Sequence, residues 1–419
     1  MTVGEYAGVP LQNPDDTWRN GAVFALRDDA VEDAAVELDG WTTTVIGGKR
    51  AVITCGPSTA TTQADSFAVS LVAANLGLDF MSAIGQSHSA IVDAEDANFV
   101  WWHEPVSGDV VMRATQVATF PMSSNPTFVV TDATGNVVPP SPPATPMAHD
   151  AFRFIRMCKT SDDLFDAYRN LFLAFECLLS AIRPRQRTSR NRWEGEKQWF
   201  MAALAVADEM VPVVRLAPQG EPNPKDWVYQ NIYSAERSAL MHAKQGQHYL
   251  LPHDATSRAQ LTRSLGSLWG YVQELMKKHL GVKSGFASFY KHGWAMMADN
   301  MLKDVVLFAS DDATPHHRTS ENPVLSDAAH TVEMEAGPPS DDPSDALLRT
   351  TLGSCVPAEL GRLDGIRRAG ARLKGDTPYL VIDTDLTGPL HVGDSLTRFE
   401  VLYGARSVSA MGAPRHFSS

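Results

Sequence analysis

The chain has 419 residues, of which 44 % are hydrophobic and 20 % are charged, and its formal net charge is −13. This length predicts two or three domains, and the composition is ordinary for a soluble globular protein. The acidic balance argues against sequence-independent binding to long duplex nucleic acid, which needs a wide basic face, but it leaves room for a small basic pocket.

Neither the cysteines nor the N-terminal residues predict an exported protein. The four cysteines are widely spaced without a CxxC pair, so they favour neither a zinc ribbon nor a disulfide framework. The N-terminal stretch has no basic segment followed by an apolar run, so it does not resemble a signal peptide. The most apolar window, 67–84, contains Ser70, Asn75 and Asp79 and therefore predicts a buried helix rather than a membrane span. We expect a cytoplasmic, reduced protein.

The first part of the chain, residues 1–148, is predicted to be a small α+β domain. Two β-rich runs, 41–46 and 50–54, are joined by a Gly-Gly-Lys turn and indicate a hairpin. Apolar residues at helical spacing predict a helix over 64–81. Further strands are expected at 91–92, 99–102 and 110–119.

Two features of this part carry alternatives. Trp101, Trp102 and His103 either line a pocket or belong to the core, and the core is favoured because large aromatic side chains dominate protein cores. The run 136–146 contains five prolines, which exclude helix and central strand. A stiff linker is therefore favoured over a ligand for a proline-binding domain.

Residues 149–310 are the most helical part and are predicted to form a bundle. The helix over 160–183 opens with residues that can cap it and carries a broad apolar face, as expected for a helix packed on several neighbours. The remaining helices are expected at 194–210, 225–244, 258–280 and 286–308.

The last part, residues 324–419, returns to short strands and shows no evident chemistry. Strands are expected at 331–334, 379–383 and 397–403, with a short helix at 357–368 between them. This part either forms a β-rich accessory domain or completes the N-terminal domain. The polar segment before it contains His316 and His317, but no third ligand lies at a familiar spacing, so a solvated linker is favoured over a metal site.

One pair of residues in the bundle points to a chemistry. Arg237 is followed after four residues by His242, and no other Arg of the chain precedes a His by four to six residues. Tyr233 lies one turn before this Arg. The pattern resembles the HEPN superfamily of helical bundles, many of which cut RNA without a metal. The helix over 160–183 also resembles the first long helix of HEPN-type proteins, including a family encoded with bacterial methylamine utilisation genes.

The resemblance covers roughly residues 150–300 and implies RNA binding, a homodimer with facing motifs, and a role in defence against phage or in a toxin system. It departs from the pattern at one position. Active HEPN nucleases usually carry Asn, Asp or His directly after the motif Arg, whereas Ser238 stands here. A Ser hydroxyl still donates or accepts a hydrogen bond, but the departure puts catalysis in question.

An Arg and a His are a chemically sensible minimum for cleaving RNA without a metal. His suits the two proton transfers because its ordinary pKa lies near neutrality, and Arg suits the phosphate because it is a planar, permanently charged fork of donors. Five residues on a regular helix, however, turn through roughly 500°, which leaves the two side chains about 140° apart. Either the helix distorts near His242 or a second chain completes the site.

Further polar residues could support this pair. Asn170 and Glu176 lie beside the apolar face of the helix over 160–183, where they are either partners of Arg237 or a buried polar network that fixes helix packing. Five arginines lie close together between the first two helices of the bundle. This group either contacts RNA phosphates or is a solvated loop, and it consists of Arg183, Arg185, Arg187, Arg190 and Arg192.

The sequence therefore predicts an α+β protein with a central all-α, HEPN-like bundle flanked by small β-rich N- and C-terminal segments. The leading hypothesis is a homodimeric RNA-binding protein that cuts RNA through Arg237 and His242, without a metal or other cofactor. The alternative is a non-catalytic protein whose bundle mediates dimerisation or binds a protein partner or a nucleotide. In that case both residues would be ordinary helix residues.

Overall fold

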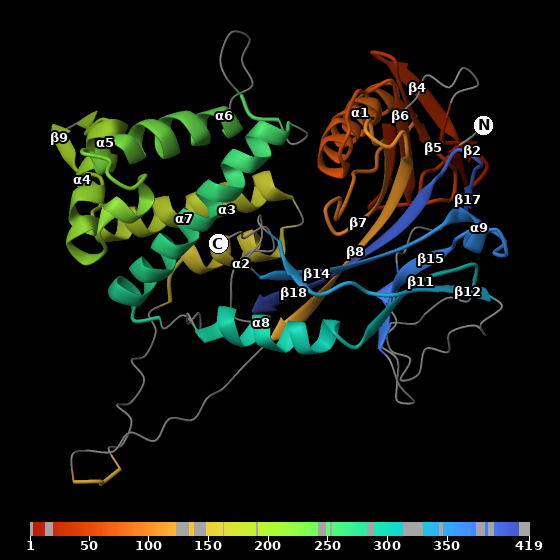
Figure 1. The fold of residues 1–419 in the computed structure, drawn as a ribbon. Helices are drawn as coiled ribbons and strands as arrows, with labels where there is room; N and C mark the ends of the chain where they lie inside the picture. The colour runs from red at the N-terminus through yellow and green to blue at the C-terminus, as the bar shows by residue number, and fades with distance from the viewer. Residues whose placement is uncertain are drawn as a thin grey trace. The chain divides into compact units, whose positions relative to one another are not determined.

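The structure is a computed structural model. It describes residues 3–12, 20–122, 134–137, 148–161, 163–189, 192–241, 249–251, 254–282, 289–312, 330–342, 347–373, 382–383 and 389–409. The chain forms two compact units that interleave along the sequence (Figure 1). The β-rich unit comprises Met1–Phe120 and Lys291–Ser407, and the helical unit comprises Pro121–Tyr290 and Val408–Ser419.

A nine-stranded sheet forms the centre of the β-rich unit. In spatial order its strands are β13 (Ser340–Asp341), β14 (Leu348–Cys355), β18 (Arg398–Ser409), β8 (Val110–Met122), β7 (Ala97–His103), β3 (Asn20–Ala25), β6 (Ala51–Gly56), β5 (Trp41–Val45) and β4 (Ala34–Leu38). β7 pairs with β8, and β14 with β18, in antiparallel fashion. The sheet thus joins strands from both ends of the chain.

The seam between the two ends is a parallel pair, β8 and β18. The Thr397 Oγ1 hydroxyl, just before β18, donates to the Val110 carbonyl at 2.8 Å, and Arg113 forms a 2.7 Å ion pair with Glu400. From the first contact to the second, the residue number rises by three on β8, from 110 to 113, and by three on the β18 side, from 397 to 400. The two strands therefore run in the same direction. The C-terminal part therefore completes the N-terminal sheet, which was one of the two alternatives left open by the sequence. The coarser α+β prediction with a helical middle region is confirmed.

Smaller sheets accompany the large one in the β-rich unit. One has the order β17 (Leu390–Val392), β1 (Gly4–Tyr6), β2 (Val9–Pro10). The other has the order β12 (Thr331–Met334), β11 (Val305–Ser310), β15 (Arg368–Leu373), β16 (Ile382–Asp383). A short helix, α9 (Pro357–Leu360), is all that the structure has of the helix expected at 357–368.

Helix α1 (Gln63–Ala83) packs on the large sheet against β3 to β7. It begins where Thr62 accepts a hydrogen bond from the Asp65 amide, and the Ser66 hydroxyl donates to the Trp101 carbonyl at 2.8 Å. By length and composition alone, α1 is the one helix in the described part of the chain that could cross a membrane. Trp101 is fully buried and Trp102 is 3 % exposed, so both are core residues, as favoured over the pocket.

The helix predicted over 286–308 is two elements in the structure. Helix α8 (Phe289–Leu302) ends, and β11 follows from Val305, paired with β12 and β15. The run of Val305 to Ala309 is apolar without interruption, and such a short run does not distinguish a buried helix from a buried strand. From Lys291 onwards this stretch belongs to the β-rich unit and not to the bundle.

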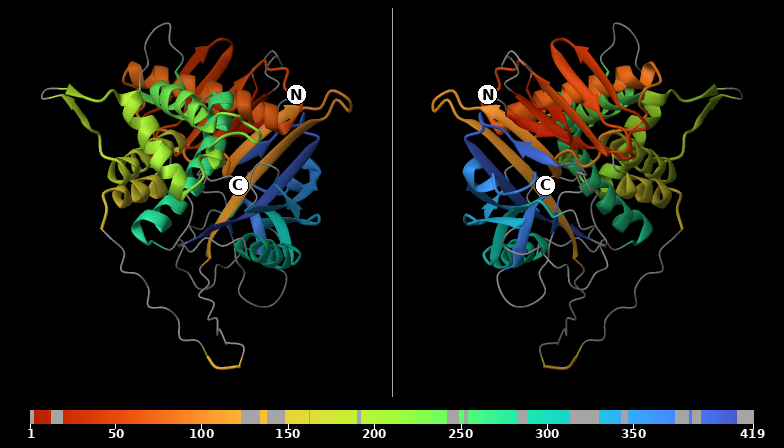
Figure 2. Two further views of the ribbon diagram at one scale, coloured as in Figure 1. Left: turned by 90° about the vertical axis from the view of Figure 1, so that its left-hand side faces the viewer. Right: turned by 90° about the vertical axis from the view of Figure 1, so that its right-hand side faces the viewer.

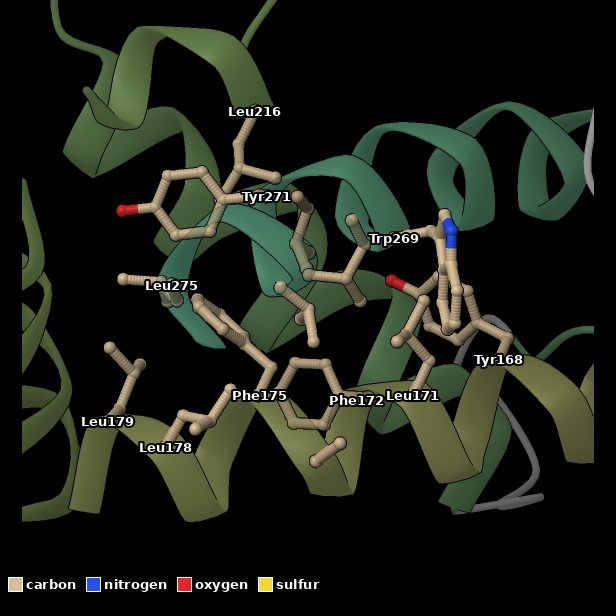
Figure 3. Close-up of a cluster of buried hydrophobic side chains, with 14 of the residues drawn as sticks. Tyr168, Leu171, Phe172, Phe175, Leu178, Leu179, Leu216, Trp269, Tyr271 and Leu275 are labelled. Carbon is tan, nitrogen blue, oxygen red and sulfur yellow. The ribbon is translucent and has the colours of Figure 1, made fainter. Parts of the chain in front are cut away.

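The helical unit is built on α3 (Leu164–Ile182) and α7 (Ala255–Leu280), which pack against each other. The other helices are α2 (Ala151–Thr160), α4 (Glu196–Met210), the 3₁₀ helix η1 (Val213–Leu216), α5 (Pro224–Val228), the π-helix η2 (Tyr229–Glu236) and α6 (Arg237–Met241). A small hairpin, β9 (Arg187–Ser189) and β10 (Arg192–Trp193), connects α3 to α4. Figure 3 shows the aromatic core, in which the Phe175 ring meets the rings of Phe172 and Tyr271 edge-on.

The caps of these helices follow from the sequence. The helix predicted over 160–183 is α3, and Asp163, one of the expected capping residues, caps it by accepting a hydrogen bond from the Asp166 amide at 2.9 Å. Asp254 caps α7 in the same manner, through the Ser257 amide. Gly281 ends α7 with a φ of 67°, a conformation that glycine adopts without strain.

Candidate functional site

Arg237 lies at the end of a helical segment with an altered pitch. The chain runs helically from Pro224 to Met241, and its middle eight residues, Tyr229–Glu236, are a π-helix. The Arg237 amide donates to the Ile232 carbonyl five residues earlier, so the wider turn persists up to the functional residue. Such π segments are rare and occur often at functional sites. This π segment precedes Arg237, whereas His242, near which one of the two alternatives places a distortion, lies outside the described residues.

Two carboxylates and two aromatic rings surround the Arg237 guanidinium. Its Nη2 lies 3.6 Å from Glu176 of α3 and 3.4 Å from Glu196 of α4. The guanidinium carbon lies 4.8 Å from the ring centroid of Tyr233 and 5.9 Å from that of Phe172, both within the range of cation–π attraction. Arg237 is thus held in place by three helical elements.

The two carboxylates differ in exposure and therefore in freedom. The Glu176 side chain is 19 % exposed, whereas that of Glu196 is 56 % exposed. Burial raises the pKa of Glu176, Arg237 lowers it, and Glu196 raises it again. Glu196 also accepts a hydrogen bond from the Tyr233 hydroxyl, and burial together with this bond raises the pKa of Tyr233. Glu176 is a fixed partner of Arg237, and Glu196 is one that solvent can reach.

A small hollow opens beside Arg237 on the surface of α3. It adjoins a second cation, Arg169, whose Nη2 forms a 2.8 Å ion pair with Asp166 one turn away. The hollow is lined by Tyr168, Arg169, Phe172, Leu173, Arg237 and Leu240. The surface that this hollow exposes is apolar, so Arg169 and Arg237 border it with the apolar parts of their side chains.

Below this hollow, the carboxylate of Glu236 lies in a buried polar network. Glu236 is 4 % exposed and accepts hydrogen bonds from the Tyr168 hydroxyl, from Gln260 at 3.1 Å and from Ser264 at 2.7 Å. Burial and the neighbouring Glu236 raise the pKa of Tyr168. This network ties the last residue of the π-helix to α3 and α7. Among the described residues, the carboxylates within 4 Å of the Arg237 guanidinium are Glu176 and Glu196, and not the sequence neighbour Glu236.

No family model, curated protein or solved structure matches the chain. The function is therefore argued from the site. In the described part of the chain no group of three or more His, Cys, Asp or Glu side chains is placed to hold a metal ion. His316 and His317 lie outside the described residues.

The remaining residues predicted from the motif have different positions. His242 lies outside the described residues, so its relation to Arg237 stays a prediction. Ser238 is half-buried in α6. The Asn170 side-chain amide donates to the Asp166 carbonyl of its own helix at 2.8 Å, whereas Glu176 lies beside Arg237. The structure thus brings Glu176, Tyr233 and Arg237 together.

The arginine group forms part of a hairpin and its base. Arg183 forms an ion pair with Glu194, and the Arg185 Nε donates to the Glu194 carbonyl at 2.8 Å. Arg187 lies on the exposed strand β9 over the ring of Trp193, and Arg192 is exposed on β10. Arg190 lies outside the described residues. The group is therefore divided between side chains that hold the hairpin and side chains that face solvent.

Sequence reasoning missed Glu196, Glu236 and Tyr168. Glu196 follows the arginine group by four residues and had no pattern of its own. Tyr168 was assigned only to the apolar face of its helix, although a buried tyrosine hydroxyl usually finds a partner. That rule, applied to Tyr168, would have indicated a polar group inside the bundle.

Proposed function

We propose that the helical unit is a HEPN-like module that binds RNA at Arg237 and cleaves it without a metal. The observation that carries this proposal is the Arg237 guanidinium at the edge of a hollow, with Glu176 and two aromatic rings fixing its position. A fixed guanidinium binds a phosphate at a lower entropic cost than a flexible one. Arg169, whose guanidinium pairs with Asp166, borders the same hollow.

Binding of a phosphate would exchange one partner of Arg237 for another. Glu196 is the more exposed of the two carboxylates, so it is the one that a phosphate would displace. Glu176 would stay and hold the guanidinium from the other side. The exchange keeps Arg237 paired throughout, which avoids the cost of leaving a half-buried charge without a partner.

The cleavage step requires two proton transfers and charge stabilisation on the phosphate. A His242 imidazole removes the proton of the ribose 2′-hydroxyl, and the 2′-oxygen then bonds to phosphorus. The bond from phosphorus to the 5′-oxygen breaks, and that oxygen leaves with a proton from a protonated imidazole. The products are a 2′,3′-cyclic phosphate and a 5′-hydroxyl. Arg237 stabilises the charge that grows on the phosphate.

A second copy of the chain would supply the second proton carrier. On a regular helix Arg237 and His242 lie about 140° apart, so a two-fold pairing of α6 gathers these groups at one phosphate. Pairing would also bring two Arg237 side chains near each other. Glu176 and Glu196 offset this like charge in each copy.

A non-catalytic module is the second candidate, and a specific observation favours it. Arg237 already has two carboxylate partners, and Ser238 replaces the residue usual in active HEPN nucleases. The same contacts would then only fix the helices of a dimerisation or nucleotide-binding bundle. Incubation of the whole protein with labelled RNA in EDTA separates the two, because only the enzyme cleaves.

Binding has its own test. In fluorescence anisotropy with a labelled oligoribonucleotide, we expect Arg237→Ala to weaken binding at least tenfold. Arg263→Ala, which removes an exposed arginine on α7, is the matched control and should change little. Equal affinities of the two variants would refute the assignment of Arg237 to the RNA.

A further inference from the structure

The hairpin between α3 and α4 presents a tryptophan and an arginine to solvent. Figure 2 shows the two strands projecting from the helical unit. Trp193 is 50 % exposed, and the guanidinium carbon of Arg187 lies 5.0 Å from its ring centroid. Most large apolar side chains are buried, so a half-exposed indole flanked by a cation indicates a surface that something else covers.

The base of this hairpin is held firmly although its two short strands are exposed. Glu194 is 2 % exposed and accepts bonds from the Arg183 guanidinium and from the Gln186 amide at 2.6 Å. The hydrogen bond from Arg183 lowers the pKa of Glu194, which keeps this carboxylate charged. The Trp199 indole N–H donates to the Arg183 carbonyl at 3.0 Å. Trp193 is therefore presented by a preorganised element, and binding there costs little ordering.

Neighbouring cations and aromatic rings extend from the first turn of α4, which follows the hairpin, to Arg237. Lys197, in the first turn of α4, lies 4.8 Å from the ring centroid of Tyr229. The Tyr229 ring stacks on Tyr233, with centroids 5.6 Å apart, and the Arg237 guanidinium carbon lies 4.8 Å from the Tyr233 centroid. Trp193 precedes Glu196, a partner of Arg237, by three residues, a span of about 10 Å of extended chain. The Trp193 ring and the Arg237 guanidinium are thus connected through Glu196, and a single strand of several nucleotides can span them.

We propose that Trp193 stacks a nucleobase of a single-stranded RNA whose phosphate lies at Arg237, with Arg187 contacting the adjoining backbone. This inference rests on the proposed function and names its substrate class. Stacking on an exposed aromatic ring requires an unpaired base, because the bases of a duplex are covered by their neighbours. The net charge of −13 also disfavours the wide basic surface that a long duplex needs.

The test compares Trp193→Ala and Trp193→Phe in the whole protein. The probe is a labelled single-stranded oligoribonucleotide, alone or annealed to its complement, and the readout is fluorescence anisotropy at low salt. Loss of one stacked base predicts that Trp193→Ala weakens single-strand binding by about 5- to 150-fold, whereas Trp193→Phe keeps most of it. Wild-type protein should bind the duplex less tightly than the single strand. Val214→Ala, at a 49 % exposed apolar residue of the same unit, should change neither affinity.

A second readout reports on the ring itself, should the alanine variant fold poorly. The chain has nine tryptophans, so the difference in RNA-induced fluorescence quenching between wild type and Trp193→Phe isolates the signal of Trp193. Equal quenching in both proteins, or unchanged affinity of a folded Trp193→Ala variant, overturns the stacking proposal. If Arg237→Ala still weakens binding in that case, the proposed function survives. If the wild-type protein binds no RNA, both proposals fail.

Discussion

Replacing Tyr168 by Phe tests the buried network that holds the π-helix beneath Arg237. Tyr168 is fully buried, and its hydroxyl donates to the carboxylate of Glu236. The substitution removes a single oxygen atom, so the cost is almost entirely that of one hydrogen bond to a charged group. Such bonds contribute about 1.5–3 kcal/mol to stability. Gln260 and Ser264 both donate to Oε1 of Glu236, so the substitution leaves the buried Oε2 without its Tyr168 partner, and the cost should lie at the upper end of this range or above it.

Tyr271→Phe is the matched control in the same bundle. Tyr271 is 1 % exposed, and its hydroxyl donates to the Val211 backbone carbonyl at 3.0 Å, a neutral acceptor. Bonds between neutral groups contribute about 0.5–1.5 kcal/mol, so the control should lose roughly half as much stability. Urea unfolding at neutral pH, followed by far-UV circular dichroism, measures both free energies of unfolding.

The comparison has a clear refuting result. If Tyr168→Phe costs no more than Tyr271→Phe, Tyr168 and Glu236 do not form a charge-assisted hydrogen bond in solution. The account of how the π-helix is anchored would then be wrong. If Tyr168→Phe lowers the free energy of unfolding strongly but leaves RNA affinity unchanged, the bond between Tyr168 and Glu236 stabilises the fold without contributing to RNA binding.

Three further predictions follow from the site. Burial raises the folded-state pKa of Glu176 above its unfolded value, so its contribution to stability is largest at acidic pH and is lost as pH rises through that pKa. The free energy of unfolding of Glu176→Gln relative to wild type, measured by urea titration, should therefore increase from pH 4 to pH 7. A difference that stays flat or falls contradicts the assignment. Arg187→Ala combined with Arg192→Ala should reduce the slope of log affinity against log salt for single-stranded RNA by about 1.4, and an unchanged slope would make both residues solvated surface. Light scattering at micromolar concentration should give twice the 45.6 kDa chain mass, whereas a single-chain mass would refute the shared two-fold site.

Local signals predicted the elements of the bundle well. The apolar spacing that indicates α3 and α7 lies within each helix. Each acidic cap, Asp163 or Asp254, directly precedes the helix that it caps. The strands β12 and β18 were also found near their expected positions. These elements depend on periodicity and capping, which short stretches of sequence carry in full.

The pairing of strands that lie far apart in the sequence could not be predicted from such local signals. β8 and β18 are paired at a separation of 287 residues, and no local feature of either strand names its partner. The strand β11 was mistaken for helix because its continuous apolar run suits both. The π-helix before Arg237 ends at Glu236, which accepts hydrogen bonds from Tyr168 and Ser264 of other helices, and such tertiary contacts leave no mark on the local sequence.

The candidate site was predicted in part for the same reason. Arg237 was identified from its spacing to His242, and Glu176 from its place beside an apolar helix face. Glu196 was missed because its proximity to Arg237 arises only when α4 packs on the π-helix. Contacts between helices far apart in sequence decide such partners, and spacing within one helix does not.

The central claim is that Arg237 and His242 cleave RNA without a metal. The most direct measurement follows a labelled single-stranded RNA with the purified protein in excess EDTA, analysed on a denaturing gel. We predict cleavage by wild type and Arg263→Ala that leaves 2′,3′-cyclic phosphate ends, and its loss in Arg237→Ala and His242→Ala variants whose melting curves match wild type. Cleavage that persists in both of these variants, or an intact RNA with the wild-type protein, would contradict the claim.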